Sequence, residues 1–181
     1  MHADSPLQAQ AKQAALVHQG EFAWPTIALA IMVIVGYAAT IAMVSAQQLP
    51  LIVGTGLTVI WVYLAYTVLH EAAHGSISGS YTSRRWVNEA LGYLMAWIMM
   101  IPLTAHRHEH LTHHRNTNDP EGDPDYVVAG MTRSPFHLLR ATLGIVVSQY
   151  RHYLAHRWPN APLRQNIIFC LEILLAVGAR L

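Results

Sequence analysis

The fold of this chain is decided by residues 51–74, which read LIVGTGLTVIWVYLAYTVLHEAAH. Residues 51–69 are uncharged and almost entirely apolar, and about 20 such residues are long enough to cross a bilayer as a helix. The stretch then runs without a break into His70, Glu71 and His74. It therefore predicts a transmembrane helix that ends in two histidines at one membrane surface.

A second apolar stretch, WPTIALAIMVIVGYAATIAMVSA, precedes it at residues 24–46 and is also uncharged. A very short turn that contains Gln47, Gln48 and Pro50 joins the two stretches, so they predict a tight transmembrane helical hairpin. Residues 1–23 are polar to mildly amphipathic and hold no apolar core of signal-peptide length. They are expected to be a retained N-terminal segment.

The composition agrees with a membrane protein. Of the 181 residues, 53% are hydrophobic and 12% are charged, whereas an average soluble domain has about 25% charged residues. The net charge of +1 argues against nucleic acid as a partner, because phosphate binding needs an excess of basic residues. The single cysteine, Cys170, excludes an internal disulfide framework and a thiolate-rich metal site.

The distribution of charge predicts the orientation of the hairpin. Glu71 is the only charged residue between Glu21 and Arg84, whereas nine of the eleven basic residues fall from Arg84 to Arg164. Basic segments remain on the cytoplasmic side of a membrane. The N-terminal segment and the histidine-rich segments are therefore expected to be cytoplasmic, and the turn between the spans is expected outside.

Three further apolar stretches are shorter or less apolar than a span. Residues 90–103 predict a re-entrant or interfacial helix, because a crossing would place the histidines before and after them on opposite sides. Residues 136–156 predict a helix in the interface, with a helix packed on the aqueous side as the alternative. Residues 166–181 are expected to start a further transmembrane helix, so the predicted fold is an all-α, multi-pass integral membrane protein.

Histidine is the other unusual feature, since its 12 copies outnumber the 11 lysines and arginines. His70 and His74 are four residues apart and therefore share one face of a helix. The segment HRHEHLTHH, residues 106–114, places three more histidines on one helix face: His110, His113 and His114. Three or more neutral imidazoles that converge near the headgroups would bind iron, zinc or copper.

The HEAAH segment taken alone also fits the HExxH pattern of zinc metalloproteases, with Glu71 as general base. That interpretation gives no role to the second cluster, His110, His113 and His114. The additional histidines therefore favour a centre with more than one metal ion. A non-catalytic membrane protein that binds metal or haem is a further alternative.

Residues 70–76, HEAAHGS, and 107–125, RHEHLTHHRNTNDPEGDPD, resemble the first two histidine boxes of the membrane fatty acid desaturases, within the wider group of histidine-box desaturases and hydroxylases. The resemblance implies that residues 24–181 form a desaturase-like membrane domain. It also implies that five histidines are ligands of a non-haem di-iron centre: His70, His74, His110, His113 and His114.

The same resemblance implies an oxygen-dependent fatty acyl desaturase. Its two iron ions would activate dioxygen to remove hydrogen from methylene groups, with electrons from a ferredoxin, cytochrome b5 or a similar carrier. The expected partners are therefore a fatty acyl lipid, dioxygen, this electron donor and membrane lipids. A related lipid, alkane or carotenoid hydroxylase or ketolase remains open, because desaturation and hydroxylation share the first hydrogen abstraction.

The remaining histidines do not match ligand positions of that family. For His106, one turn before His110, a role in supporting the ligands or as an additional ligand is the less favoured alternative. His152 and His156 are expected to be interfacial residues, because their spacing does not fit the third box, H/Q-x-x-H-H. Since no third box occurs and the sequence stops inside an apolar run, we expect it to be the N-terminal part of a longer protein.

Metal-bound imidazoles usually donate their second N–H to a carboxylate or carbonyl. The carboxylates near the histidines in sequence are Glu71, Glu109, Asp119, Asp123 and Asp125. The alternative for the aspartates is a solvated turn around residues 120–124, which contain two prolines and a glycine.

Overall fold

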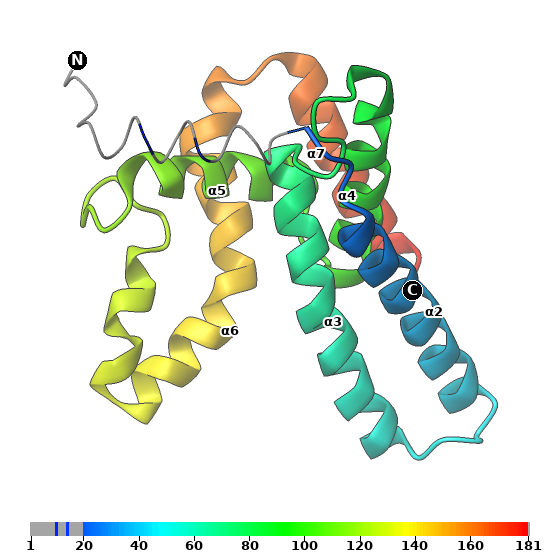
Figure 1. Ribbon diagram of the computed structural model, residues 1–181. Coiled ribbons are helices and arrows are strands. Elements are labelled where there is room, and N and C mark those ends of the chain that lie inside the picture. Colours follow the sequence, from blue (N-terminus) through cyan, green and yellow to red (C-terminus); the bar gives the residue numbers. More distant parts are fainter. Residues whose placement is uncertain (1–9, 11–13, 15–19, 181) are drawn as a thin grey trace.

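The structure, a computed structural model, describes residues 10, 14 and 20–180. The described residues form helices joined by turns and contain no strand, so the predicted all-α class is confirmed (Figure 1). Most of the predicted N-terminal segment, residues 1–23, lies outside the described residues.

Helices α2 (Trp24–Ser45) and α3 (Leu51–His74) form the predicted hairpin. Both are long and apolar enough to cross a membrane. Helix α3 continues through the HEAAH segment and ends at Gly75, whose φ of 72° is a left-handed conformation that glycine adopts without strain. The histidine pair thus belongs to the last turns of the same helix that is long and apolar enough to span a bilayer.

The hairpin is held together around a glycine. Gly36 on α2 faces the Trp61 ring on α3, and a Cβ atom at this position would come within 2.4 Å of the ring. The indole Nε1 of Trp61 donates to Thr40 Oγ1 at 3.0 Å, and that hydroxyl donates to the Gly36 carbonyl at 2.8 Å. The polar groups inside this apolar hairpin are therefore satisfied, as a membrane interior requires.

Helix α4 (Arg85–Met99) follows a short 3-10 turn, η1 (Thr82–Arg84), and packs along the histidine-bearing half of α3. The contact buries a core that includes Val68, Leu69, Ala72 and Met95. Asn88 of α4 donates to the hydroxyl of Ser78 on the connecting loop at 2.8 Å and so ties the start of α4 to that loop. This packing holds the end of α3 in a defined position.

Helix α5 (Leu103–Asn116) starts after a sharp break at residues 100–102 and is bent by 99° from the segment that contains α4. Met100 has a φ of 58°, and Pro102 disfavours a helical conformation at the residue before it. The predicted non-spanning stretch 90–103 is therefore divided between α4 and the first residue of α5. Figure 1 shows α5 lying across the end of α3.

The remaining chain forms η2 (Tyr126–Arg133), α6 (Pro135–His152), a π-helical turn η3 (Tyr153–Arg157), η4 (Trp158–Asn160) and α7 (Leu163–Gly178). Tyr153 and Phe169 stack at 4.4 Å and pack with Ala105 of α5 in a second core. Helix α7, the predicted start of a further span, is 16 residues long and lies beside α4, where Trp97 donates to the Leu175 carbonyl.

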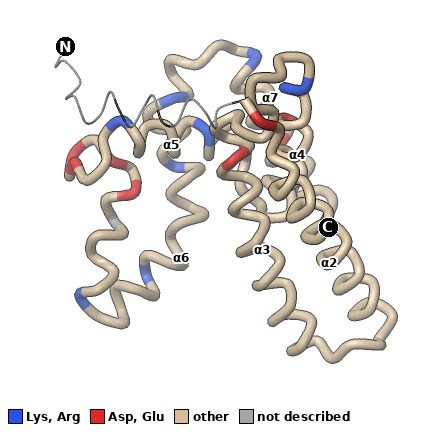
Figure 2. Tube along the Cα trace, viewed as in Figure 1, with Lys and Arg blue, Asp and Glu red and all other residues tan. Residues whose placement is uncertain are grey.

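Charged residues are absent from most of the α2–α3 hairpin. Along α2 and α3 the only charged residue is Glu71, near the end where α5 crosses (Figure 2). The hairpin away from that end is entirely uncharged, as a membrane interior requires. The histidine clusters therefore lie at the polar end of the hairpin.

Candidate metal centre

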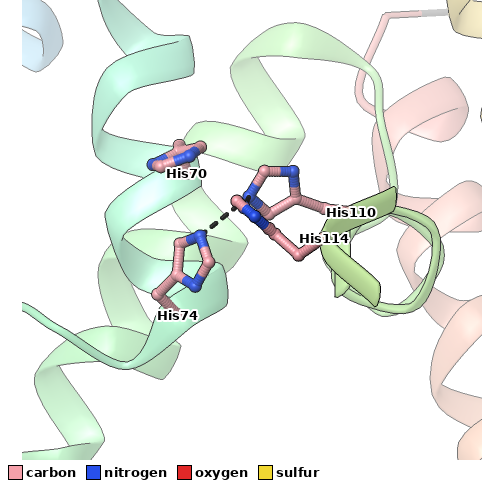
Figure 3. A group of neighbouring side chains, drawn as sticks. All are labelled: His70, His74, His110 and His114. Carbon is pink, nitrogen blue, oxygen red and sulfur yellow. Dashed lines mark hydrogen bonds between the residues drawn. The ribbon is translucent and has the colours of Figure 1, made fainter. Parts of the chain in front are cut away.

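The crossing of α3 and α5 brings four histidines together: His70, His74, His110 and His114 (Figure 3). One nitrogen from each ring lies within 4.8 Å of the nitrogens of the others. Nε2 of His110 is 2.8 Å from Nε2 of His74 and 3.1 Å from Nε2 of His114. Each helix contributes two histidines four residues apart, so the convergence follows from helix geometry and the crossing of the two axes.

These distances fit a bound metal ion. A metal–imidazole bond is about 2.0–2.1 Å, so ligands on opposite sides of one ion are about 4 Å apart. Small side-chain rotations would bring four nitrogens that already lie within 4.8 Å into that range. Neutral imidazoles suit iron, zinc and copper.

The local environment keeps His110 unprotonated. Burial, and after it the repulsion that protonated neighbouring imidazoles would exert, first that of His106, together lower the pKa of His110 to about 3. A neutral imidazole has a free lone pair, which is the form that binds a metal.

His113, the fifth expected ligand, is not part of this group. Its position on α5 turns the ring away from α3 and toward the acidic loop, where Nδ1 lies 2.7 Å from Oδ1 of Asp123 and 3.9 Å from Oδ2 of Asp125. The hydrogen bond to Asp123 leaves Nε2 of His113 as the free ligand atom. Metal-binding histidines are commonly oriented by a carboxylate in this manner.

Asp123 also organises the loop that follows α5. Its carboxylate accepts the backbone N–H groups of Asn118 and Asp125, each at 2.9 Å. Burial alone would raise the pKa of Asp123, but the hydrogen bonds from His113 and from these two N–H groups outweigh it and hold the pKa below its usual value. Asp123 therefore has both of the roles considered from the sequence, orienting a histidine and forming a turn.

The other carboxylates differ. Glu71 contacts Nδ1 of His70 at 3.1 Å, as a supporting carboxylate would. Asp119 accepts the N–H of Glu121 at 3.1 Å and serves the turn. Glu109 is 1% exposed, and neither of its oxygens has a hydrogen-bond partner among the described residues; burial raises its pKa to about 8.

His106 is buried next to the four-histidine group. Its ring stacks on His110 at 5.3 Å, and its Nδ1 lies 3.2 Å from Oε1 of Gln149 on α6. Its Nε2 has no hydrogen-bond partner among the described residues. Buried polar atoms are normally satisfied, so Nε2 of His106 and the two carboxylate oxygens of Glu109 are exceptions among the described residues, and neither residue belongs to the four-histidine group.

A separate set of histidines lies outside the group. His108 stacks on His152 at 5.7 Å, and His152 lies 4.7 Å from His156. The sequence does not predict this contact, because His108 and His152 are more than 40 positions apart and meet only through tertiary packing. These three rings do not join the four-histidine group.

Comparison with known proteins connects this arrangement to a family. The family model described as fatty acid desaturase matches residues 46–181. A bifunctional fatty acid conjugase/Delta(12)-oleate desaturase from Punica granatum is 31% identical over 74 residues, which are 41% of this chain and 16% of that protein. An sn-1 acyl-lipid omega-3 desaturase (ferredoxin) from Nostoc sp. (strain 36) is 26% identical over 98 residues, which are 52% of this chain and 26% of that protein.

The matches thus cover about a quarter or less of these two curated relatives. No solved structure matches the chain significantly.

Proposed function

Because the chain belongs to the fatty acid desaturase family, we propose that it acts as a membrane-bound, oxygen-dependent fatty acyl desaturase with a histidine-ligated iron centre. The observation that carries the proposal is the convergence of His70, His74, His110 and His114, which come from two separate histidine boxes, at the polar end of a membrane hairpin. A lipid-soluble acyl chain reaches such a position from the bilayer.

In this proposal the four converging histidines hold one iron ion, and His113, oriented by Asp123, contributes to a second. Iron bound there supplies the oxygen activation that is needed to remove hydrogen from an unactivated methylene group. The electrons come from a ferredoxin, cytochrome b5 or a similar carrier, and the printed name of the Nostoc relative includes ferredoxin.

The chain's own residues position this chemistry. Helices α2 and α3 anchor the centre in the bilayer, and the packing of α4 on α3 fixes the histidine-bearing turns. Asp123 holds one ring orientation of His113, and burial keeps His110 neutral. The positive-inside rule favours the cytoplasmic side for this end of the hairpin, and in this proposal the electron donor acts on that side.

The geometry supports the desaturase over the other interpretations. In a metalloprotease the HExxH glutamate faces the water on the metal, whereas Glu71 is tied to the Ser76 hydroxyl and to His70. A haem held by two histidines needs them on opposite faces of a wide flat ring. Here four imidazoles pack with centroids 4.5–6.4 Å apart, which leaves no room for a porphyrin between them.

The proposal is tested by expressing the gene, from its start to its natural stop codon, in a host that lacks the corresponding desaturase. Fatty acids are analysed by gas chromatography with mass spectrometry, and the metal content of the purified protein is measured. We expect a new double bond and bound iron; a hydroxylated product would assign the chain to the hydroxylases. Zinc in place of iron, with unchanged fatty acids, would overturn the proposal.

The site assignment has its own test. His110→Ala is expected to abolish product and to lower bound iron, because His110 lies at the centre of the group, within 3.1 Å of two other ligand nitrogens. His156→Ala serves as the matched control, since this histidine is exposed and lies outside the group. Full iron and full activity in His110→Ala would contradict the assignment.

A further inference from the structure

A cavity of about 520 Å³ lies along a face of α5 that includes Arg107, Leu111 and Arg115 and is next to the face that carries His110 and His114. It is bounded by α5, by Tyr93 of α4 and by the start of α7. Four arginines line it: Arg107, Arg115, Arg157 and Arg164. None of the proposed iron ligands lines this cavity, so its chemistry is separate from that of the centre.

The cavity has an excess of positive charge. Arg107 pairs with Glu89 at 2.9 Å and Arg157 donates to the neutral Gln165 at 2.8 Å. Arg115, Arg157 and Arg164 form no ion pair with the described residues, and the lining contains no acidic side chain. Guanidinium groups gathered around one space repel one another unless an anion lies between them, and their planar donors match phosphate oxygens.

The start of α7 adds to this field. The N-terminal residues Pro162, Arg164 and Gln165 line the cavity, and α7 continues for 16 residues from Leu163. The first turn of a helix presents unpaired N–H groups and a partial positive charge. The start of α7 and the three guanidinium groups that form no ion pair with the described residues therefore favour the same ligand class, an oxyanion.

The neighbouring cavity is apolar. It has a volume of about 200 Å³, lies between α4 and α7, and shares Tyr93 and Ile168 with the arginine cavity. Its lining is mostly apolar and includes Trp97, Leu171 and Leu175. Its one acidic side chain, Glu172, accepts the backbone N–H of Thr104 at 3.2 Å.

We propose that the two adjoining cavities form a phospholipid site, in which the arginines hold the headgroup phosphate and the groove between α4 and α7 holds an acyl chain. A phosphate next to an apolar groove is the chemistry of a phospholipid, whereas inorganic phosphate would leave the groove without a ligand. Basic pockets between helices at the cytoplasmic surface are suited to anionic headgroups. Because none of the proposed iron ligands lines either cavity, we assign this lipid the role of bracing α4, α5 and α7 and not that of the substrate.

The test measures lipid binding by native mass spectrometry of the detergent-purified protein. Phosphatidylglycerol is compared with diacylglycerol of the same acyl chains and with inorganic phosphate as competitor. We expect one tightly held phosphatidylglycerol per chain, no comparable binding of diacylglycerol, and competition by inorganic phosphate only at much higher concentration. Equal binding of diacylglycerol, or competition by phosphate at the concentration of the lipid, would overturn the proposal.

Variants locate the site. The double substitution Arg115→Gln with Arg164→Gln is expected to weaken phosphatidylglycerol binding about thirtyfold, at about 1 kcal/mol for each arginine. The matched control, Arg133→Gln with Arg140→Gln, removes two arginines outside the cavity and should bind as the parent does. Leu171→Trp fills the groove and keeps all four arginines. This variant should also bind the lipid more weakly. Unchanged affinity in both cavity variants, with unchanged circular dichroism, would contradict the site.

Discussion

Asp123 is the residue that joins the loop after α5 to a proposed iron ligand, because it accepts from His113 and from two backbone N–H groups. We expect Asp123→Asn to lower metal affinity by about 10–100-fold, the usual effect of losing the carboxylate behind a ligand histidine. Metal retained after dialysis against graded chelator measures the loss. Asp119→Asn is the control, since among the described residues this carboxylate bonds only the Glu121 N–H; an equal loss there would assign the effect to the loop.

At this scale the sequence predicts part of the site. His70 with His74 and His110 with His114 follow from i, i+4 spacing alone, and the structure brings these pairs together. The orientation of His113 depends on which side of α5 meets α3, and spacing cannot define that side. The contact between His106 and Gln149 depends on where α6 packs, 43 residues later.

Among the elements, the break between α4 and α5 sets the position of the second histidine box. Met100, at the break, has a φ of 58° and is 38% exposed. A left-handed conformation costs a residue with a side chain about 1–2 kcal/mol. Glycine avoids this cost, but part of the gain is offset because glycine has greater conformational freedom in the unfolded chain. We expect Met100→Gly to raise the thermal midpoint by a few degrees, measured by circular dichroism in detergent.

The comparison for that substitution is Met99→Gly. Met99 is the last residue of α4 and packs against the core, so glycine there should lower the midpoint by loss of helix propensity and packing. If both variants are destabilised alike, the conformation at Met100 is not a source of strain.

The contact between α2 and α3 gives a second test at the scale of elements. Gly36→Ala is expected to destabilise the hairpin by about 1–3 kcal/mol, because the new methyl group overlaps the Trp61 ring and that ring would have to move. Gly56→Ala is the control, since nothing lies within 4 Å of a Cβ there. Thermal unfolding followed by circular dichroism should separate the two; equal midpoints would mean that the helices do not pack through Gly36.

The elements themselves were predicted to different degrees. The hairpin was predicted closely, because long uncharged stretches have few alternatives in a bilayer. The break at residues 100–102 lies inside a continuous apolar stretch, where hydropathy does not change. The sequence therefore shows that this stretch is shorter than a span, but it does not predict the 99° bend. The π-helical turn at Tyr153–Arg157 has no periodicity of its own and was not predicted.

For the whole molecule, the distribution of charge predicts an orientation in the membrane. In a Cys170→Ser background, Gln48→Cys lies in the turn between α2 and α3, and Glu121→Cys lies in the loop after α5. Both positions are exposed. We expect an impermeant maleimide to label Gln48→Cys in intact cells and Glu121→Cys only after permeabilisation, because the basic segments remain inside. The reverse pattern would invert the proposed topology.

The length of α3 has a consequence for the membrane in which the protein works. The helix contains 24 residues with the histidine pair in its last turns, and at about 1.5 Å per residue it is about 36 Å long, against a hydrocarbon thickness of about 30 Å. The histidines are therefore held at a set height above the opposite leaflet. A thicker bilayer would draw them toward the hydrocarbon, and a thinner one would tilt the helix. We expect product formation to change with the chain length of the host lipids. Hydrophobic mismatch would then make the activity of the protein depend on bilayer thickness, and so on the acyl chains of the surrounding lipids.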